Sequence, residues 1–159
     1  MIDDIDRKLL NFLQADARVS NAELARRVGM APSGVLERVK KLEERGFIRG
    51  YEARLDAKRL GSGLVAFTFV RSDDRVGGID SAKALAAIPE VQEVHHIAGE
   101  DCYLIKIRVA DVEALGRLLR EKIGVIPAIR STRTTIVMET LKESGAVQVP
   151  GGGVDAGGA

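Results

Sequence analysis

This 159-residue sequence has little cysteine and no long apolar run. The single cysteine, Cys102, cannot form a disulfide within the chain. Charged residues interrupt every hydrophobic stretch before it reaches the roughly 20 residues that a membrane-spanning helix needs. The opening residues 1–6, MIDDID, have neither the basic start nor the apolar run of a secretion signal. With 45% hydrophobic and 30% charged residues, we expect a globular cytoplasmic protein with no membrane role.

The formal net charge of +1 hides an uneven distribution of charge along the chain. Residues 1–60 carry 13 Lys and Arg against 10 Asp and Glu, whereas residues 61–159 carry 11 against 13. The first part is therefore the better candidate for contact with a polyanion.

Three helices are predicted before residue 47. Apolar residues recur at helical spacing over 5–13, which predicts a first helix that ends near Asp16. Ser20 and Glu23 have the spacing of a capping box, which opens a second helix that Gly29 ends.

Pro32 suits the first position of a third helix, which Gly46 ends. The alternation of apolar and charged residues over 47–55 predicts a small two-stranded wing. Residues 57–63 form a basic, glycine-containing linker after a first domain over 1–56. The expected inward stripe of the third helix consists of Val35, Leu36, Val39 and Leu42.

The second half has the pattern βαββαβ. Residues 88–91 and 126–129 each follow a helix and introduce a strand, as two related βαβ halves would. We therefore predict an α+β fold, a winged helix-turn-helix followed by a ferredoxin-like domain over 64–143, with a flexible glycine-rich tail over 144–159. The expected strands are 64–70, 91–97, 103–109 and 129–141, and the expected helices are 81–88 and 112–123.

Both crossover helices of such a domain cover the same face of the sheet. In the strand over 64–70, one side offers Val65, Phe67 and Phe69 and the other offers Ala66, Thr68 and Val70, and neither side is strongly polar. We infer that self-association buries the second face.

The third helix has a free face outside its apolar stripe. A helix-turn-helix places this helix in the major groove, where small residues near its start allow close approach to the bases. Arg38 suits a bidentate contact with guanine, and the other cations suit phosphates. Glu37 lies on the same face and is left unassigned. The predicted contacts with double-stranded DNA are Ser33, Gly34, Arg38, Lys41, Arg45 and Arg49.

These motifs closely resemble the Lrp/AsnC, or feast/famine, transcription regulators over residues 2–143. The resemblance implies an amino-acid-sensing second domain, and dimers that associate further, commonly to octamers, with the effector bound between subunits. The segments that carry it are 5–10 (IDRKLL), 21–33 (NAELARRVGMAPS), 37–48 (ERVKKLEERGFI), 48–51 (IRGY), 99–104 (GEDCYL) and 132–134 (TRT).

A zwitterionic effector needs an acceptor for its ammonium group and donors for its carboxylate. The loop over 99–103 offers backbone N–H groups and the carboxylate of Asp101, and two threonines share one face of the last strand. Both threonines could equally be ordinary strand residues. The candidate effector residues are His96, Gly99, Asp101, Tyr103, Thr132 and Thr134.

Two other classes of function stay open. Siroheme decarboxylases resemble the same two-domain family, although the basic face of the third helix argues against such an enzyme. A metabolite-binding module without DNA binding is the other alternative. His95 and His96 are neighbours on a strand and point to opposite faces, so they cannot hold one metal together without a bulge. Cys102 has no evident base partner. We predict no catalytic residue, metal or cofactor.

Overall fold

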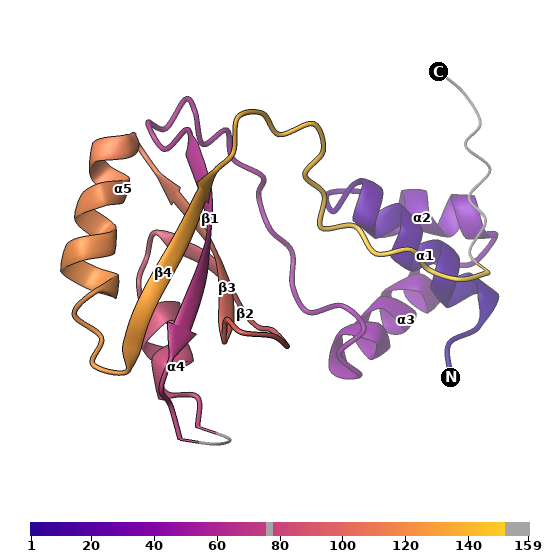
Figure 1. Ribbon diagram of the computed structural model, residues 1–159. Helices are drawn as coiled ribbons and strands as arrows, with labels where there is room; N and C mark the ends of the chain where they lie inside the picture. Colours follow the sequence, from indigo (N-terminus) through magenta and orange to yellow (C-terminus); the bar gives the residue numbers. More distant parts are fainter. Residues whose placement is uncertain (76–77, 152–159) are drawn as a thin grey trace. The chain divides into compact units, whose positions relative to one another are not determined.

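The computed structural model describes residues 1–75 and 78–151, which form two compact units (Figure 1). Among the described residues, one unit joins Met1–Arg54 with residues 143–151, and the other is Leu55–Lys142. Of the tail predicted to be flexible, residues 152–159 lie outside the described residues. In the part of the chain that is described, no helix combines the length and the apolar character needed to cross a membrane.

The amino-terminal unit is built from α1 (Asp4–Ala15), α2 (Asn21–Val28) and α3 (Pro32–Glu44). Asp3 caps α1, because its carboxylate accepts the backbone N–H of Asp6 at 2.9 Å and the carboxylate of Asp6 accepts the N–H of Asp3 at 3.3 Å. This reciprocal pair satisfies two backbone donors at the helix start.

The capping box predicted for α2 is only half formed. Ser20 Oγ accepts the N–H of Glu23 at 3.2 Å, but the carboxylate of Glu23 binds Arg26 and Arg27 instead of returning to the cap. The two guanidinium groups lower the pKa of Glu23 to about 2. Gly29 ends α2 with φ 70°, a left-handed conformation that glycine adopts without strain.

The core of this unit consists of side chains from all three helices. Leu9 of α1, Leu24 of α2 and Val35 of α3 are 0% exposed. The prediction that Leu36 belongs to the buried stripe is wrong, since its side chain is 56% exposed. Val35, Val39 and Leu42 already supply the positions i, i+4 and i+7, and Leu36 is turned about 100° away from Val35.

The predicted two-stranded wing is not formed over residues 47–55, where the backbone is irregular. Tyr51 instead donates its hydroxyl to Glu43 Oε1 of α3 at 2.8 Å. Burial, followed by the hydrogen bond to Glu43, raises the pKa of Tyr51 to about 12. The phenol therefore stays a hydrogen-bond donor. The segment after α3 is thus held to that helix by a side chain.

The second unit is an antiparallel sheet in the order β2-β3-β1-β4, with two helices. The chain order βαββαβ is the one predicted, and the α+β fold class is confirmed. The elements are β1 (Leu64–Ser72), α4 (Asp80–Ala86), β2 (Val91–His96), β3 (Tyr103–Val109), α5 (Val112–Leu118), its π-helical continuation η1 (Leu119–Ile123) and β4 (Ile129–Ile136).

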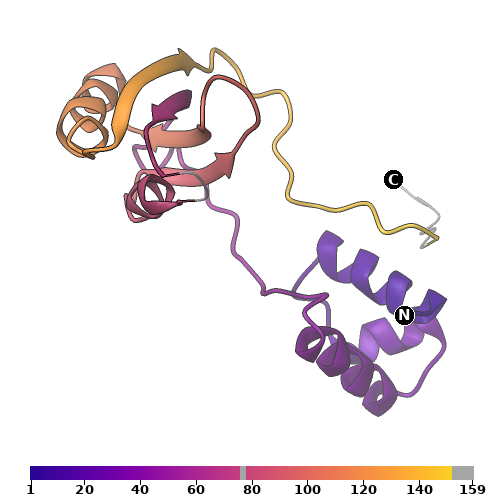
Figure 2. The same cartoon turned by 60° about the horizontal axis from the view of Figure 1, so that its bottom comes forward.

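Both helices pack against one face of the sheet, as Figure 2 shows. Leu85 of α4 and Leu115 of α5 join Ala66 of β1 and Ile105 of β3 in a single core. The other face, here called the open face, has no helix of this unit over it. Its apolar centre consists of Val65, Phe67, Phe69 and Leu104.

Leu9→Ala should lower the free energy of unfolding of the amino-terminal unit by about 2–5 kcal/mol, because it leaves a cavity among fully buried side chains. Leu36→Ala removes a side chain of the same size from the surface and should change it by less than about 0.5 kcal/mol. Urea denaturation followed by circular dichroism measures both. Equal losses in the two variants would contradict the placement of these side chains.

Candidate DNA-binding surface and effector site

The turn between α2 and α3 presents one side of α3 to solvent. Val35, Val39 and Leu42 are buried on the inner side. Ser33, Glu37 and Lys41 are exposed and follow at intervals of four residues, so they form one line along the outer side. The predicted free face therefore exists, and Glu37 is at its centre.

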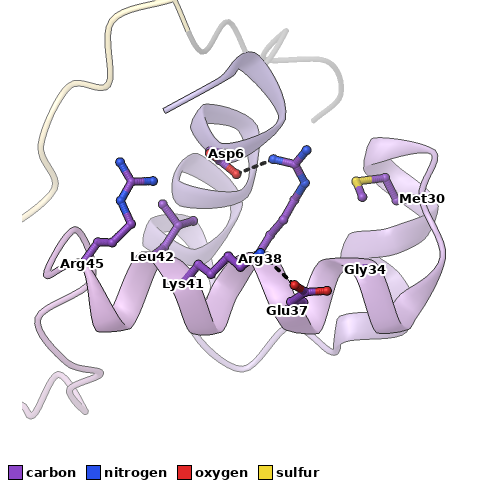
Figure 3. Close-up of a pocket in the computed structure, with 8 residues that line it drawn as sticks. All are labelled: Asp6, Met30, Gly34, Glu37, Arg38, Lys41, Leu42 and Arg45. Carbon is purple, nitrogen blue, oxygen red and sulfur yellow. Dashed lines mark hydrogen bonds and ion pairs between the residues drawn. The ribbon is translucent and has the colours of Figure 1, made fainter. Parts of the chain in front are cut away.

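A hollow of about 310 Å³ lies beside this line (Figure 3). It brings together four of the six residues predicted to contact DNA, whereas Ser33 and Arg49 lie outside its lining. The residues that line it are Asp6, Met30, Gly34, Glu37, Arg38, Lys41, Leu42 and Arg45. Cations of α3 thus meet the first turn of α1 here.

Arg38, the predicted reader of guanine, binds two carboxylates. Its Nη1 atom lies 2.7 Å from Asp6 Oδ1, as Figure 3 shows, and 2.7 Å from Asp3 Oδ2. The side chain of Arg38 is 30% exposed. The N–H of Asp6 first, and Arg38 second, lower the pKa of Asp3, while both aspartates raise the pKa of Arg38. Arg38 therefore ties the middle of α3 to the start of α1.

The remaining cations differ in how far they are engaged. Lys41 Nζ lies 2.7 Å from Glu37 Oε1, and this lysine lowers the pKa of Glu37. Arg45 stacks on Phe47, with 4.8 Å between its guanidinium carbon and the ring centre. Arg49 is exposed beyond the end of α3. These contacts are exposed, so exchanging them for phosphate has little desolvation cost.

The loop between β2 and β3 carries the predicted effector residues Gly99 and Asp101. Gly99 has φ 137°, a conformation that L side chains rarely adopt. Asp101 Oδ2 accepts from Arg133 Nη2 of β4 at 3.1 Å. Arg133 also lies over the ring of Phe69, 4.1 Å from its centre. An acid and a base are thus side by side next to an aromatic ring.

Tyr103 lies in the core of the sheet unit and is 2% exposed. Its hydroxyl donates to Asp74 Oδ2 at 3.0 Å, and Ser81 Oγ donates to Asp74 Oδ1 at 3.0 Å. Burial, followed by Asp74, raises the pKa of Tyr103 to about 12. The ring of His96 lies 5.3 Å from that of Tyr103. His96 is exposed and Tyr103 is a buried support beneath it.

The two threonines of β4 lie on the helix-covered face. Thr134 is paired with Thr68, and their hydroxyl oxygens are 2.9 Å apart, whereas Thr132 is paired with Val70 and is exposed. Asp101, by contrast, contacts Arg133, which belongs to the open face. Within one chain, these contacts do not bring Asp101 and the threonines together around one ligand.

The adjacent histidines have different surroundings. His95 Nε2 lies 3.1 Å from Glu93 Oε2, whereas His96 faces Tyr103. Within residues 1–75 and 78–151, no three His, Cys, Asp or Glu side chains are grouped as a metal site would require. Cys102 Sγ donates to the carbonyl of Ser72 at 3.3 Å.

Three side chains that matter here escaped the sequence analysis. Asp3 and Asp6 have the i, i+3 spacing of a capping box, which is a readable local signal. Their bond to Arg38 spans more than 30 residues, and no local pattern encodes it. Arg133 lies between two candidate threonines, but only the fold brings it to Asp101.

Comparison with known families identifies the class of each unit. Residues 2–49 match the model of a winged helix-turn-helix DNA-binding domain, and residues 65–147 match the Lrp/AsnC ligand binding domain. The fold and its surfaces thus define a DNA-binding regulator with a ligand-binding domain. The chain belongs to the Lrp/AsnC family, as its sequence motifs indicated.

Individual relatives support this assignment. The leucine-responsive regulatory protein of Escherichia coli K12 is 41% identical over 145 residues, which are 90% of this chain and 88% of that protein. A transcriptional regulator of Neisseria meningitidis, solved with L-methionine, has a TM-score of 0.89 at 28% identity and covers 94% of this chain and 98% of its own.

A feast or famine regulatory protein of M. tuberculosis, also solved with L-methionine, has a TM-score of 0.86 at 37% identity and covers 94% of this chain and 100% of its own. These relatives are named as regulators, which confirms a transcription regulator that is not an enzyme. They give no support to the siroheme decarboxylase alternative.

Arg38→Gln should lower the free energy of unfolding of the amino-terminal unit by about 1–3 kcal/mol, because it leaves the poorly exposed carboxylate of Asp6 without its cation. Lys41→Gln breaks an exposed pair and should cost less than about 1 kcal/mol. Thermal denaturation without DNA compares the two variants. An Arg38 variant as stable as the parent would show that this arginine is not a structural brace.

Proposed function

We propose that this protein is an amino-acid-responsive transcription regulator that binds double-stranded DNA through the exposed side of α3. The observation that carries the proposal is the line of small and charged residues outside the buried stripe of α3, next to a helix-turn-helix turn. Such a helix enters the major groove with its first residues nearest the bases. Since DNA is the partner, we place its site of action in the cytoplasm.

Ser33 and Gly34 lie in the first turn of α3 and take the positions nearest to base edges. Lys41, Arg45 and Arg49 take phosphates, and Glu37 becomes free to accept from a cytosine amino group when Lys41 leaves it. Arg38 reaches guanine only if it releases Asp3 and Asp6. Breaking these two ion pairs costs free energy that the exposed cations do not have to spend. We therefore place it last among the base contacts.

The effector of this proposal is an amino acid, because two relatives are solved with L-methionine and another is named leucine-responsive. Asp101 accepts the ammonium group of the ligand, and Arg133, already next to Asp101, takes its carboxylate. Gly99 belongs to the β2–β3 loop, and His96, packed on Tyr103, ends β2 just before it. In this proposal the hydroxyls of Thr132 and Thr134 come from a second copy of the chain. No cofactor is needed.

Self-association supplies that second copy. The open face carries the partly exposed Phe67, Phe69 and Leu104 without a covering helix, and such an apolar surface on a small domain favours burial. A dimer that buries it presents two recognition helices to a pseudo-palindromic site. Further association to an octamer is what the family resemblance implies. An amino acid then acts by its differential affinity for assembly states.

Binding to DNA from upstream of the protein's own gene should weaken steeply with salt, because each phosphate contact releases about one counterion. Lys41→Gln should reduce the slope of log K against log salt by about 1, while the preference between sequences stays the same. Fluorescence anisotropy over a salt series measures both quantities. Salt-insensitive binding, or none, would contradict the DNA-binding proposal.

Asp101→Ala should weaken L-methionine or L-leucine binding about 10- to 100-fold, the value of a charge-assisted hydrogen bond. Thr134→Val keeps the shape of the side chain and should weaken binding about 3- to 10-fold through loss of one hydroxyl. Calorimetry on the assembled protein tests both, with the exposed Glu113→Gln of α5 as control. Unchanged affinity in the first two variants would remove this site.

A further inference from the structure

The chain returns to α1 after leaving the sheet unit. Residues 143–151, here called the strap, belong to the same compact unit as the three helices. Gln14 holds the strap by its amide, since Val147 N–H donates to Gln14 Oε1 at 2.6 Å and Gln14 Nε2 donates to the Val147 carbonyl at 3.0 Å. One side chain thus satisfies both backbone groups of one residue, as a neighbouring strand would.

A second point of proximity shows how the strap runs. A Cβ atom added to Gly151 would lie 3.2 Å from Arg7 Nη1, and Gly151 has φ 75°. Arg7 and Gln14 are seven residues apart, so they share one side of α1 about 10 Å apart. The four steps from Val147 to Gly151 span about 13 Å when extended. The strap therefore runs antiparallel to α1 along this side.

Backbone atoms, and not a side-chain pocket, make the central contact of the strap. The Val147 side chain is 71% exposed, although its N–H and carbonyl are both bound. Exposed hydrogen bonds of this kind contribute little each. Docking is therefore weak enough to be released and re-formed, as a switching element requires.

The strap begins where the two chain connections meet. The chain passes from the helical unit to the sheet unit between Arg54 and Leu55 and returns between Lys142 and Glu143. Arg54 Nη2 donates to the carbonyl of Glu143 at 2.6 Å. This hydrogen bond joins the two connecting segments where they leave the helical unit. The DNA-binding unit is thus tethered twice, and the second tether comes directly from β4.

We propose that the strap transmits effector occupancy from β4 to the DNA-binding unit. Val137 N–H still donates to the Val65 carbonyl at 2.9 Å, so only residues 138–142 separate the sheet from the strap. Thr132 and Thr134 precede this point on the same strand, and the inference rests on their effector role in the proposed function. In this proposal, a ligand that shifts β4 changes how firmly the strap binds α1, and this in turn changes how far α1 can move.

Matched variants of one residue test the strap in the full-length protein. Val147→Pro removes the N–H that Gln14 accepts, whereas Val147→Ala keeps it and only shortens an exposed side chain. Gln14→Ala removes the partner. The measurement is the ratio of DNA dissociation constants with and without L-methionine or L-leucine.

In the parent and in Val147→Ala we expect a ratio of about 5 or more in either direction. In Val147→Pro and Gln14→Ala we expect a ratio within about 2-fold of unity, with DNA binding in the absence of ligand and calorimetric amino-acid affinity retained. Unchanged ratios in these two variants would overturn the proposal. A truncation after Lys142 should behave like Gln14→Ala, and one after Gly151 like the parent.

Hydrogen exchange separates failure of the strap from failure of the proposed function. The Val147 amide should exchange more slowly in the unliganded parent than in unliganded Gln14→Ala, a comparison that needs neither DNA nor an amino acid. A parent protein that ignores DNA and both amino acids would refute the proposed function and the signalling role of the strap together. Equal exchange rates at Val147 in Gln14→Ala and in a parent that does respond would refute the strap alone.

Discussion

The constraint on which the rest of the structure depends is that a four-stranded sheet has two faces and this chain has helices for one. Strand pairing places Phe67 and Phe69 on the face opposite to Ala66 and Val70, and α4 and α5 pack only on the latter. A sheet unit of this size gains little stability beyond the loss of chain entropy, so leaving apolar side chains in water is unfavourable. In the proposed dimer, association covers this face and presents two recognition helices to DNA instead of one.

Local patterns predicted the helices and the strands of the sheet, because caps, glycines and periodicity act within a few residues, but they wrongly predicted two strands over residues 47–55. The β3 bounds coincide with the prediction, and Ser20 and Gly29 delimit α2 as expected. Two smaller errors occur where a residue had two possible partners or positions. Glu23 binds Arg26 and Arg27 instead of the helix cap. Leu36 is exposed because Val35, Val39 and Leu42 fill the buried positions of α3.

The candidate sites depend more on long-range pairing, and there the sequence was less informative. Nothing local shows that Arg38 would meet two aspartates from the first helix or that Arg133 would reach Asp101. The residue types expected at both sites are present, since cations line α3 and an acid occupies the β2–β3 loop. What the sequence could not provide was the partner of each charge, and the partner decides whether a charge is available to a ligand.

That distinction bears on how tightly one DNA-binding unit can hold DNA. On α3, Lys41 is paired with Glu37 and Arg38 with two carboxylates, so DNA must compete with existing ion pairs instead of meeting bare cations. Each exchange returns less free energy than a new contact would. Under the proposed function, a single unit would therefore bind more weakly than two units held at a fixed spacing. Affinity would then depend on assembly and on the two connections between the units, which are the parts that the proposed effector acts on.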